Sequence, residues 1–158
     1  PGCLPSTGSV GGHGRTYSLA PTGTTGALGD YGYVAFVVRR FSSPTEAQTW
    51  VAAHEDPSVV ECLGQTYHEE DLERFGPTIV DFGIDPLAPV GHGRALTHWV
   101  TSTATGRPCT TYTDSFWNQV GSYALVSTFQ ACGMHLEPAR VRGISERVLA
   151  GLTPSPTS

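Results

Sequence analysis

Apolar and polar positions along the chain predict a series of β-strands interrupted by helical regions. Residues 31–41 form a nearly continuous run of aromatic and β-branched side chains, which is typical of a central strand. Residues 94–103 alternate instead, so that Leu96 and His98 are predicted to face one side of a strand and Trp99 the other. Further strands are predicted at residues 15–20, 78–84, 109–117 and 122–132.

Two stretches between these strands carry start signals for helices. Ser43 is placed as an N-cap, with Pro44 at the first helical position and Glu46 completing a capping box. This predicts a helix that runs to about residue 55, and the pair Asp56-Pro57 predicts a second, short one. Near the C-terminus, a proline-started segment has one apolar face and predicts a last helix, with its apolar positions at Val141, Ile144, Val148 and Leu152.

The order of these elements predicts an α+β fold. Consecutive strands joined by short turns pair antiparallel, so we expect an antiparallel sheet of about five strands. The helices are expected to pack on one face, which leaves the other face partly open. We expect a single domain over residues 31–152, a loop-rich N-terminal segment of the same domain over residues 1–30, and a flexible tail over residues 153–158.

Charge and composition exclude several classes of function. The 158 residues carry a formal net charge of −5, and the nine basic residues are all arginine. A nucleic-acid partner is therefore not expected, because binding phosphates needs a basic face. The absence of lysine also excludes Schiff-base chemistry. The glycine-rich stretches lack the phosphate-loop pattern, and no cofactor is expected.

Four cysteines, Cys3, Cys62, Cys109 and Cys132, are spread widely and form no C-x-x-C pair. This pattern favours two disulfides in an exported protein over four buried thiols in a cytosolic one. Four cysteines allow three connectivities. A hairpin turn centred on Val120 and Gly121 would place Cys109 opposite Cys132, which favours that pair and leaves Cys3 with Cys62.

The sequence contains no apolar run of membrane-spanning length. We expect a secreted or extracytoplasmic location, with a signal or membrane anchor lying beyond the ends of this sequence. Lipid attachment at Cys3 is an alternative, but it would leave three cysteines and a poorly fitting Pro1.

The histidines suggest two kinds of chemistry, and neither is favoured. His92, His98 and Asp81 are candidates for a zinc site, but no histidine has the usual ligand spacing, so no metal site is expected. Asp114, Ser115, His98 and Asp81 form a set from which a catalytic triad can be drawn, but a chain of this size offers such sets by chance. We therefore assign no catalytic residue.

Aromatic side chains on the predicted strands are the better candidates for a site. If several share the sheet face away from the helices, they line a groove suited to a small molecule or a glycan. The alternative, that they form the core beneath the helices, is somewhat favoured. The candidate ligand-binding residues are Tyr33, Trp99, Tyr112, Trp117 and Tyr123.

The motif Ala131-Cys132-Gly133 ends a predicted strand and is followed by a short loop and the proline-started helix. Together with the helical segment 42–62, which ends in a cysteine, this layout resembles the extracellular sensor domain of mycobacterial PknH-type serine/threonine kinases and related actinobacterial exported proteins. The layout is also similar to the PsbP-like fold that some actinobacterial lipoproteins use. The resemblance covers the chain from Phe41 onward and implies an extracytoplasmic α+β domain with two disulfides and a ligand groove. It implies no catalytic residues.

The favoured hypothesis is an exported, non-catalytic binding or sensor-type domain of the cell envelope whose ligand is unidentified. Two alternatives stay open. One is a secreted hydrolase that uses a histidine and a carboxylate, and the other is a protein-interaction module that docks a partner on a strand or sheet face.

Overall fold

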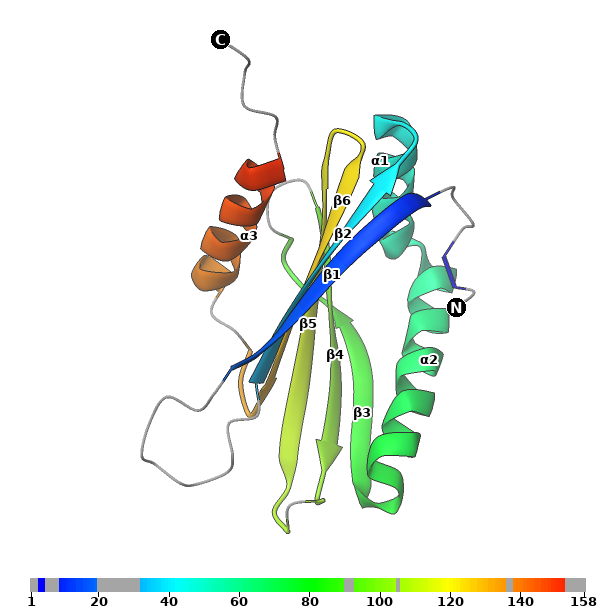
Figure 1. Ribbon diagram of the computed structural model, residues 1–158. Helices are drawn as coiled ribbons and strands as arrows, with labels where there is room; N and C mark the ends of the chain where they lie inside the picture. Colours follow the sequence, from blue (N-terminus) through cyan, green and yellow to red (C-terminus); the bar gives the residue numbers. More distant parts are fainter. Residues whose placement is uncertain are drawn as a thin grey trace.

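A computed structural model describes residues 3–4, 9–19, 32–89, 93–104, 106–135 and 138–152. Within these residues, helices lie on both sides of one antiparallel sheet (Figure 1). The strands are β1 (Ser9–Leu19), β2 (Gly32–Phe41), β3 (Ile79–Pro86), β4 (Arg94–Ser102), β5 (Cys109–Val120) and β6 (Tyr123–Cys132). The helices are α1 (Pro44–Ala52), α2 (Pro57–Phe75) and α3 (Pro138–Leu152), with short 3₁₀ segments η1 (Ala53–Glu55) and η2 (Gly76–Thr78).

The sheet order is β1-β2-β6-β5-β4-β3, and every neighbouring pair is antiparallel. The predicted α+β class is confirmed. Strand β1 adds a sixth strand at one edge and is longer than the short strand expected at residues 15–20. Strands β1 and β3 are the two edge strands of the sheet.

Both predicted helix starts are present. The hydroxyl of Ser43 accepts a hydrogen bond of 3.2 Å from the backbone N–H of Glu46, and Pro44 begins α1. The carboxylate of Asp56 accepts a bond of 2.9 Å from the N–H of Ser58 at the start of α2. These caps satisfy N–H groups that a helix leaves without partners at its first turn. The second helix is longer than expected and ends at Gly76, whose φ of 51° favours glycine.

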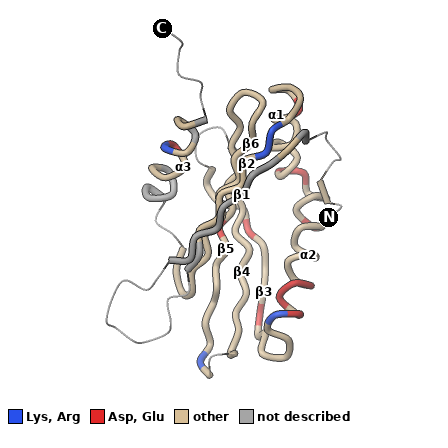
Figure 2. The backbone as a smooth tube through the Cα atoms, viewed as in Figure 1, with Lys and Arg blue, Asp and Glu red and all other residues tan. Residues whose placement is uncertain are grey.

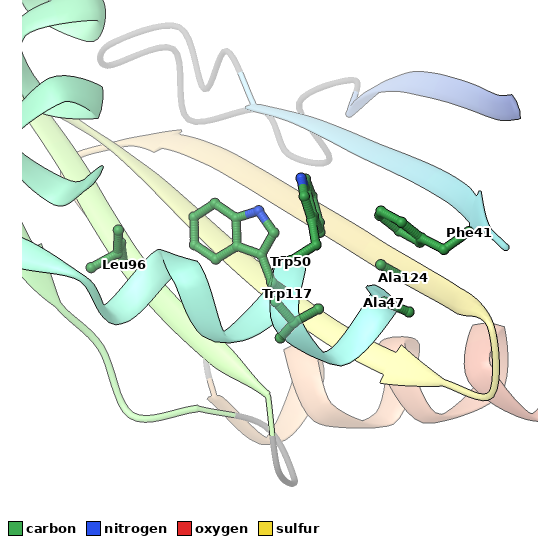
Figure 3. Close-up of a cluster of buried hydrophobic side chains, with 7 residues drawn as sticks. Phe41, Ala47, Trp50, Leu96, Trp117 and Ala124 are labelled. Carbon is green, nitrogen blue, oxygen red and sulfur yellow. The ribbon is translucent and has the colours of Figure 1, made fainter. Parts of the chain in front are cut away.

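Two apolar clusters lie on opposite faces of the sheet. Trp117 and Phe116 are consecutive residues of β5, so their side chains point to opposite faces. Trp117 joins the cluster beneath α1 and α2, which contains Phe41, Ala47, Trp50, Val51, Leu96 and Ala124 (Figure 3). Phe116 joins the cluster on the other face, with Val34, Ala95 and Phe129, and Ile144 of α3 packs against it.

The expectation that the helices all pack on one face is therefore wrong for α3. Helices α1 and α2 cover one face, and α3 lies across the sheet from them (Figure 1). The physical reason is that the central strands are apolar on both faces, and the second apolar patch also needs cover. We call the face beneath α1 and α2 the closed face, and the face that carries Phe116 and Phe129 the open face.

Both predicted disulfides are present. Cys3 and Cys62 have Cα atoms 5.4 Å apart, and Cys109 and Cys132 have Cα atoms 6.1 Å apart. The turn is one position later than predicted, because Val120 pairs with Tyr123 across Gly121 and Ser122. The φ of 55° at Gly121 suits a two-residue hairpin turn. The two bonds indicate an oxidising, extracytoplasmic location. No described helix is both long and apolar enough to cross a bilayer.

Candidate functional site

A groove of about 450 Å³ lies on the open face of the sheet. Figure 1 shows α3 beside only one end of the sheet, and strands β4 and β5 extend beyond it toward their other ends. The groove is formed by strands β3 to β5 and by the segment that follows β6. Its lining residues are Asp85, Pro86, Leu87, Thr97, Trp99, Thr101, Thr110, Tyr112 and His135.

The indole of Trp99 is held in place on this face from two sides. Trp99 and Tyr112 are direct partners in the β4–β5 register, so their side chains are neighbours. The indole Nε1–H donates a 2.8 Å hydrogen bond to Oδ2 of Asp85. A Cβ atom at Gly83, the partner of Trp99 on β3, would lie 2.6 Å from Cζ2 of the indole. The ring therefore lies over a glycine that leaves it room.

A histidine–carboxylate pair lies beside the two aromatic rings. Nδ1 of His135 is 2.9 Å from Oδ1 of Asp114, and the imidazole lies against the ring of Tyr112 with centroids 4.0 Å apart. The side chain of Asp114 is 3% exposed and that of His135 is 45% exposed. An ionised carboxylate only accepts hydrogen bonds, so this contact places a proton on Nδ1 and leaves Nε2 as the acceptor of a neutral imidazole.

Threonine hydroxyls supply the other polar groups of the groove. Thr97 is only 3% exposed, and its Oγ1 has no hydrogen-bond partner among the described residues. The hydroxyls of Thr101 and Thr110 lie 2.8 Å apart across β4 and β5. Each of these two oxygens keeps capacity for a further bond, because a hydroxyl has one donor and two acceptor sites.

A second cavity of about 470 Å³ lies at the start of α2. It shares Pro86 and Leu87 with the groove as lining residues. It is lined mainly by apolar residues, together with His54, Glu55, Glu61 and Arg94. Arg94 Nε forms a 2.6 Å ion pair with Glu55. This cavity therefore contains a charged pair that is already neutralised within the protein.

His54 packs between two tryptophans next to this cavity. Its ring centroid lies 4.2 Å from that of Trp117 and 4.7 Å from that of Trp50. Burial lowers the pKa of His54 to about 4, because the charged imidazolium is poorly solvated there, and the hydrogen bonds from Nδ1 to the carbonyls of Trp50 and Val51 only partly oppose this effect. His54 is therefore neutral at pH 7 and acts as a packing residue.

A second histidine–carboxylate pair is buried on the closed face. Nε2 of His98 lies 2.9 Å from Oδ2 of Asp71, and Tyr67 stacks on the imidazole with centroids 4.9 Å apart. Both side chains are nearly inaccessible, because Asp71 of α2 and His98 of β4 meet between the helix and the sheet. Neither residue lines the groove or the second cavity, so we assign this pair to packing.

The structure separates the five aromatic residues that the sequence suggested as ligand contacts. Trp99 and Tyr112 come together in the groove. Trp117 is buried on the closed face, and Tyr123 lies next to the β5–β6 turn, away from the groove lining. The backbone of Tyr33 pairs with Gln130, and its side chain lies outside the described part of the chain.

The sets considered for metal or triad chemistry are not assembled. Asp114 and Ser115 are consecutive on β5 and face opposite sides, and His98 lies on the closed face, away from Asp114. His92 lies outside the described residues. Among those that are described, no cluster of three histidine, cysteine or acidic side chains could hold a metal ion.

The pair His135–Asp114 was not found from the sequence. The two residues are 21 positions apart, and they meet because the chain folds back over β5 after Cys132. A polar residue at an inward position of a β-strand, such as Asp114, was the only signal available in the pattern.

Comparisons with known proteins give little guidance. No protein-family model matches the chain, and no curated protein matches it either. A solved structure from Pseudomonas aeruginosa, a protein of unknown function named as a candidate regulator, matches at a TM-score of 0.34 with 15% identity. That match covers 92% of this chain and 85% of the other. At this similarity it supports no conclusion about fold or function, and no family follows.

Proposed function

We propose that this protein is an exported binding or sensor-type domain of the cell envelope and that it binds its ligand in the groove on the open face. The observation that carries the proposal is the Trp99–Tyr112 pair, two large aromatic side chains on a part of the sheet that no described helix covers. Aromatic rings with a few fixed polar groups in a concave site are typical of small-molecule binding.

The polar groups around the rings support the same conclusion. Asp85 fixes the indole, Asp114 fixes His135, and the hydroxyls of Thr97, Thr101 and Thr110 line the groove. A site that is already arranged before the ligand arrives loses less conformational entropy on binding. The two disulfides suit an extracytoplasmic setting for this function.

The proposal is tested by screening a small-molecule fragment library with saturation-transfer NMR against three proteins. These are the wild type, a groove double variant Trp99→Ala/Tyr112→Ala, and a control variant, Val60→Ala, in the second cavity. We expect hits that bind the wild type and the control and that are lost with the groove variant.

Other outcomes would place the function elsewhere. Hits that survive the groove variant and disappear in Val60→Ala would assign binding to the second cavity. A wild type that binds no fragment would contradict a small-molecule site and would favour a protein-interaction module. The exposed apolar residues Val80 and Phe82 on edge strand β3 would then be the surface to examine.

A hydrolase is the second candidate function, and the His135–Asp114 pair is the observation that favours it. A carboxylate that holds Nδ1 orients Nε2 to act as a general base. The groove offers threonine and tyrosine hydroxyls, while Ser115 faces the other way. If this function is correct, the wild type releases p-nitrophenol from p-nitrophenyl esters and His135→Ala does not; equal rates for the two proteins would reject it.

A further inference from the structure

We infer that the groove takes a neutral carbohydrate ring, stacked on the indole of Trp99. This inference rests on the proposed function and adds the chemical class of the ligand. Its basis is the combination of an indole that packs over Gly83 and is hydrogen-bonded to Asp85, a surrounding set of hydroxyl and carboxylate groups, and the lack of arginine among the described lining residues.

The indole of Trp99 supplies the stacking surface of the groove. One side of the indole is directed at Gly83, where a Cβ atom would collide with Cζ2 and Cε2. The hydrogen bond from Nε1 to Asp85 prevents the ring from turning. Because Trp99 is only half-buried, part of the indole is left accessible in the groove. The apolar C–H face of a sugar ring packs on an aromatic plate of this kind, as nucleobases stack on aromatic residues.

The polar groups match the rim of a sugar ring. Sugar hydroxyls both donate and accept hydrogen bonds, and the groove presents both kinds of partner in Asp85, Thr101 and Thr110. The hydroxyl of Thr97 is an independent sign of a ligand, because it is buried at the groove and has no partner among the described residues. A buried hydroxyl without a hydrogen bond is costly, and a ligand hydroxyl at the groove floor relieves that cost.

The charges of the groove-lining residues favour a neutral ligand over a charged one. Among the described lining residues there is an aspartate and no arginine, and Figure 2 shows acidic residues along β3, so an anion is disfavoured. A cation would need a carboxylate directed at it. Asp85 is the one carboxylate among the described lining residues, and because its Oδ2 already accepts from the indole, its remaining acceptor capacity suits a ligand hydroxyl better than a full positive charge. A neutral ligand rich in hydroxyls therefore fits the groove best.

The test is a titration of ¹⁵N-labelled full chain with maltotriose and with tri-N-acetylchitotriose, followed by amide and indole cross-peaks. Tetramethylammonium and glucuronate serve as the cationic and anionic probes. We expect at least one of the two neutral trisaccharides to shift the peaks of Trp99, Thr101 and Tyr112 with a Kd of roughly 1 mM, as is usual for a shallow site. The two charged probes should leave these peaks unchanged.

Three variants test whether the peak shifts depend on the indole of Trp99. Trp99→Ala should weaken trisaccharide binding at least ten-fold, and Asp85→Ala and Gly83→Ala should weaken it three- to ten-fold by releasing or displacing the indole. Val60→Ala in the second cavity should leave it unchanged. The two indirect variants keep the test decisive even if Trp99→Ala does not fold.

Failure of the carbohydrate assignment can be distinguished from failure of the proposed function. If fragments bind in the groove but neither trisaccharide shifts it, or if only a charged probe does, the sugar assignment is overturned and the binding function stands. If no fragment and no sugar binds in the groove, both are overturned. Sugar binding that is insensitive to all three variants also overturns the assignment.

Discussion

In the described part of the chain, two histidine–aspartate pairs lie on opposite faces of the sheet, with the same nitrogen–oxygen distance of 2.9 Å. On the closed face, the side chains of His98 on β4 and Asp71 on α2 are 9% and 12% exposed. On the open face, His135 is 45% exposed while its partner Asp114 is buried. The pair geometry is the same, and only access differs, so access decides which pair can serve a ligand.

The tryptophans repeat this contrast. Trp117 on the closed face packs against His54 in the core, whereas Trp99 on the open face is half-buried at a groove. Both are residues of inner strands of the sheet, Trp99 on β4 and Trp117 on β5. The covering helix, rather than the residue type, separates a core aromatic from a candidate ligand contact.

The largest expected effect concerns the disulfide that connects the N-terminal segment to α2 on the closed face. Loss of Cys3–Cys62, which spans 59 residues, should lower the free energy of unfolding by about 4 kcal/mol, and loss of Cys109–Cys132, which spans 23, by about 3 kcal/mol. The reason is that the longer loop restricts the unfolded chain more. Urea denaturation of the two Cys→Ser double variants measures both values, and the reverse order would contradict the account.

Removing one histidine from each pair compares the faces directly. His98→Ala should cost about 3 kcal/mol of unfolding free energy, because it leaves Asp71 without its partner in a buried site. His135→Ala should cost about 1 kcal/mol, since water can then reach Asp114. Denaturant unfolding of both variants provides the measurement. Equal losses would mean that the two pairs have the same structural role.

Acid should lower the free energy of unfolding through His54, which packs on the closed face. Its pKa is about 4 in the folded protein and near 6.5 in the unfolded chain, so the unfolded state binds the proton first as the pH falls. Stability should therefore decrease between pH 6.5 and pH 4, by about 3 kcal/mol from this residue, and level off below that range. Unfolding curves at several pH values for wild type and His54→Phe test this, because the variant should lack this contribution. A variant with an undiminished slope would contradict it.

The smallest expected change is on the open face. Asp85→Ala removes one partly exposed hydrogen bond and should lower the free energy of unfolding by less than about 1 kcal/mol. The indole Nε1–H signal of Trp99 should move toward the position of a solvent-exposed indole. A large loss of stability would show that the groove is part of the folding core, contrary to the account.

Most of the architecture could be predicted from local sequence signals. The caps at Ser43 and Asp56 and the strands with strong apolar patterns lie where the sequence placed them. The disulfide Cys109–Cys132 followed from hairpin geometry, although the turn at Gly121 and Ser122 shifted the register. The position of α3 did not follow, because its apolar stripe shows that a helix needs cover and not which face of the sheet supplies it.

The site was only partly predictable. Trp99 and Tyr112 could be proposed from strand alternation, but the same argument also selected Trp117, which is buried on the closed face. Alternation places residues on one of two faces and does not say which face a helix will cover. The contact between His135 and Asp114 depends on the path of the chain after Cys132, for which the sequence contains no periodic signal.

The most direct test uses the three tryptophans as reporters, two on the closed face and one in the groove. The indole Nε1–H signals of Trp50, Trp99 and Trp117 are followed in ¹H–¹⁵N spectra while the strongest hit of the fragment screen is added. The account predicts a saturable shift of the Trp99 signal, with the signals of Trp50 and Trp117 unchanged. Shifts at Trp50 or Trp117 without a shift at Trp99 would contradict it and would place the ligand on the closed face.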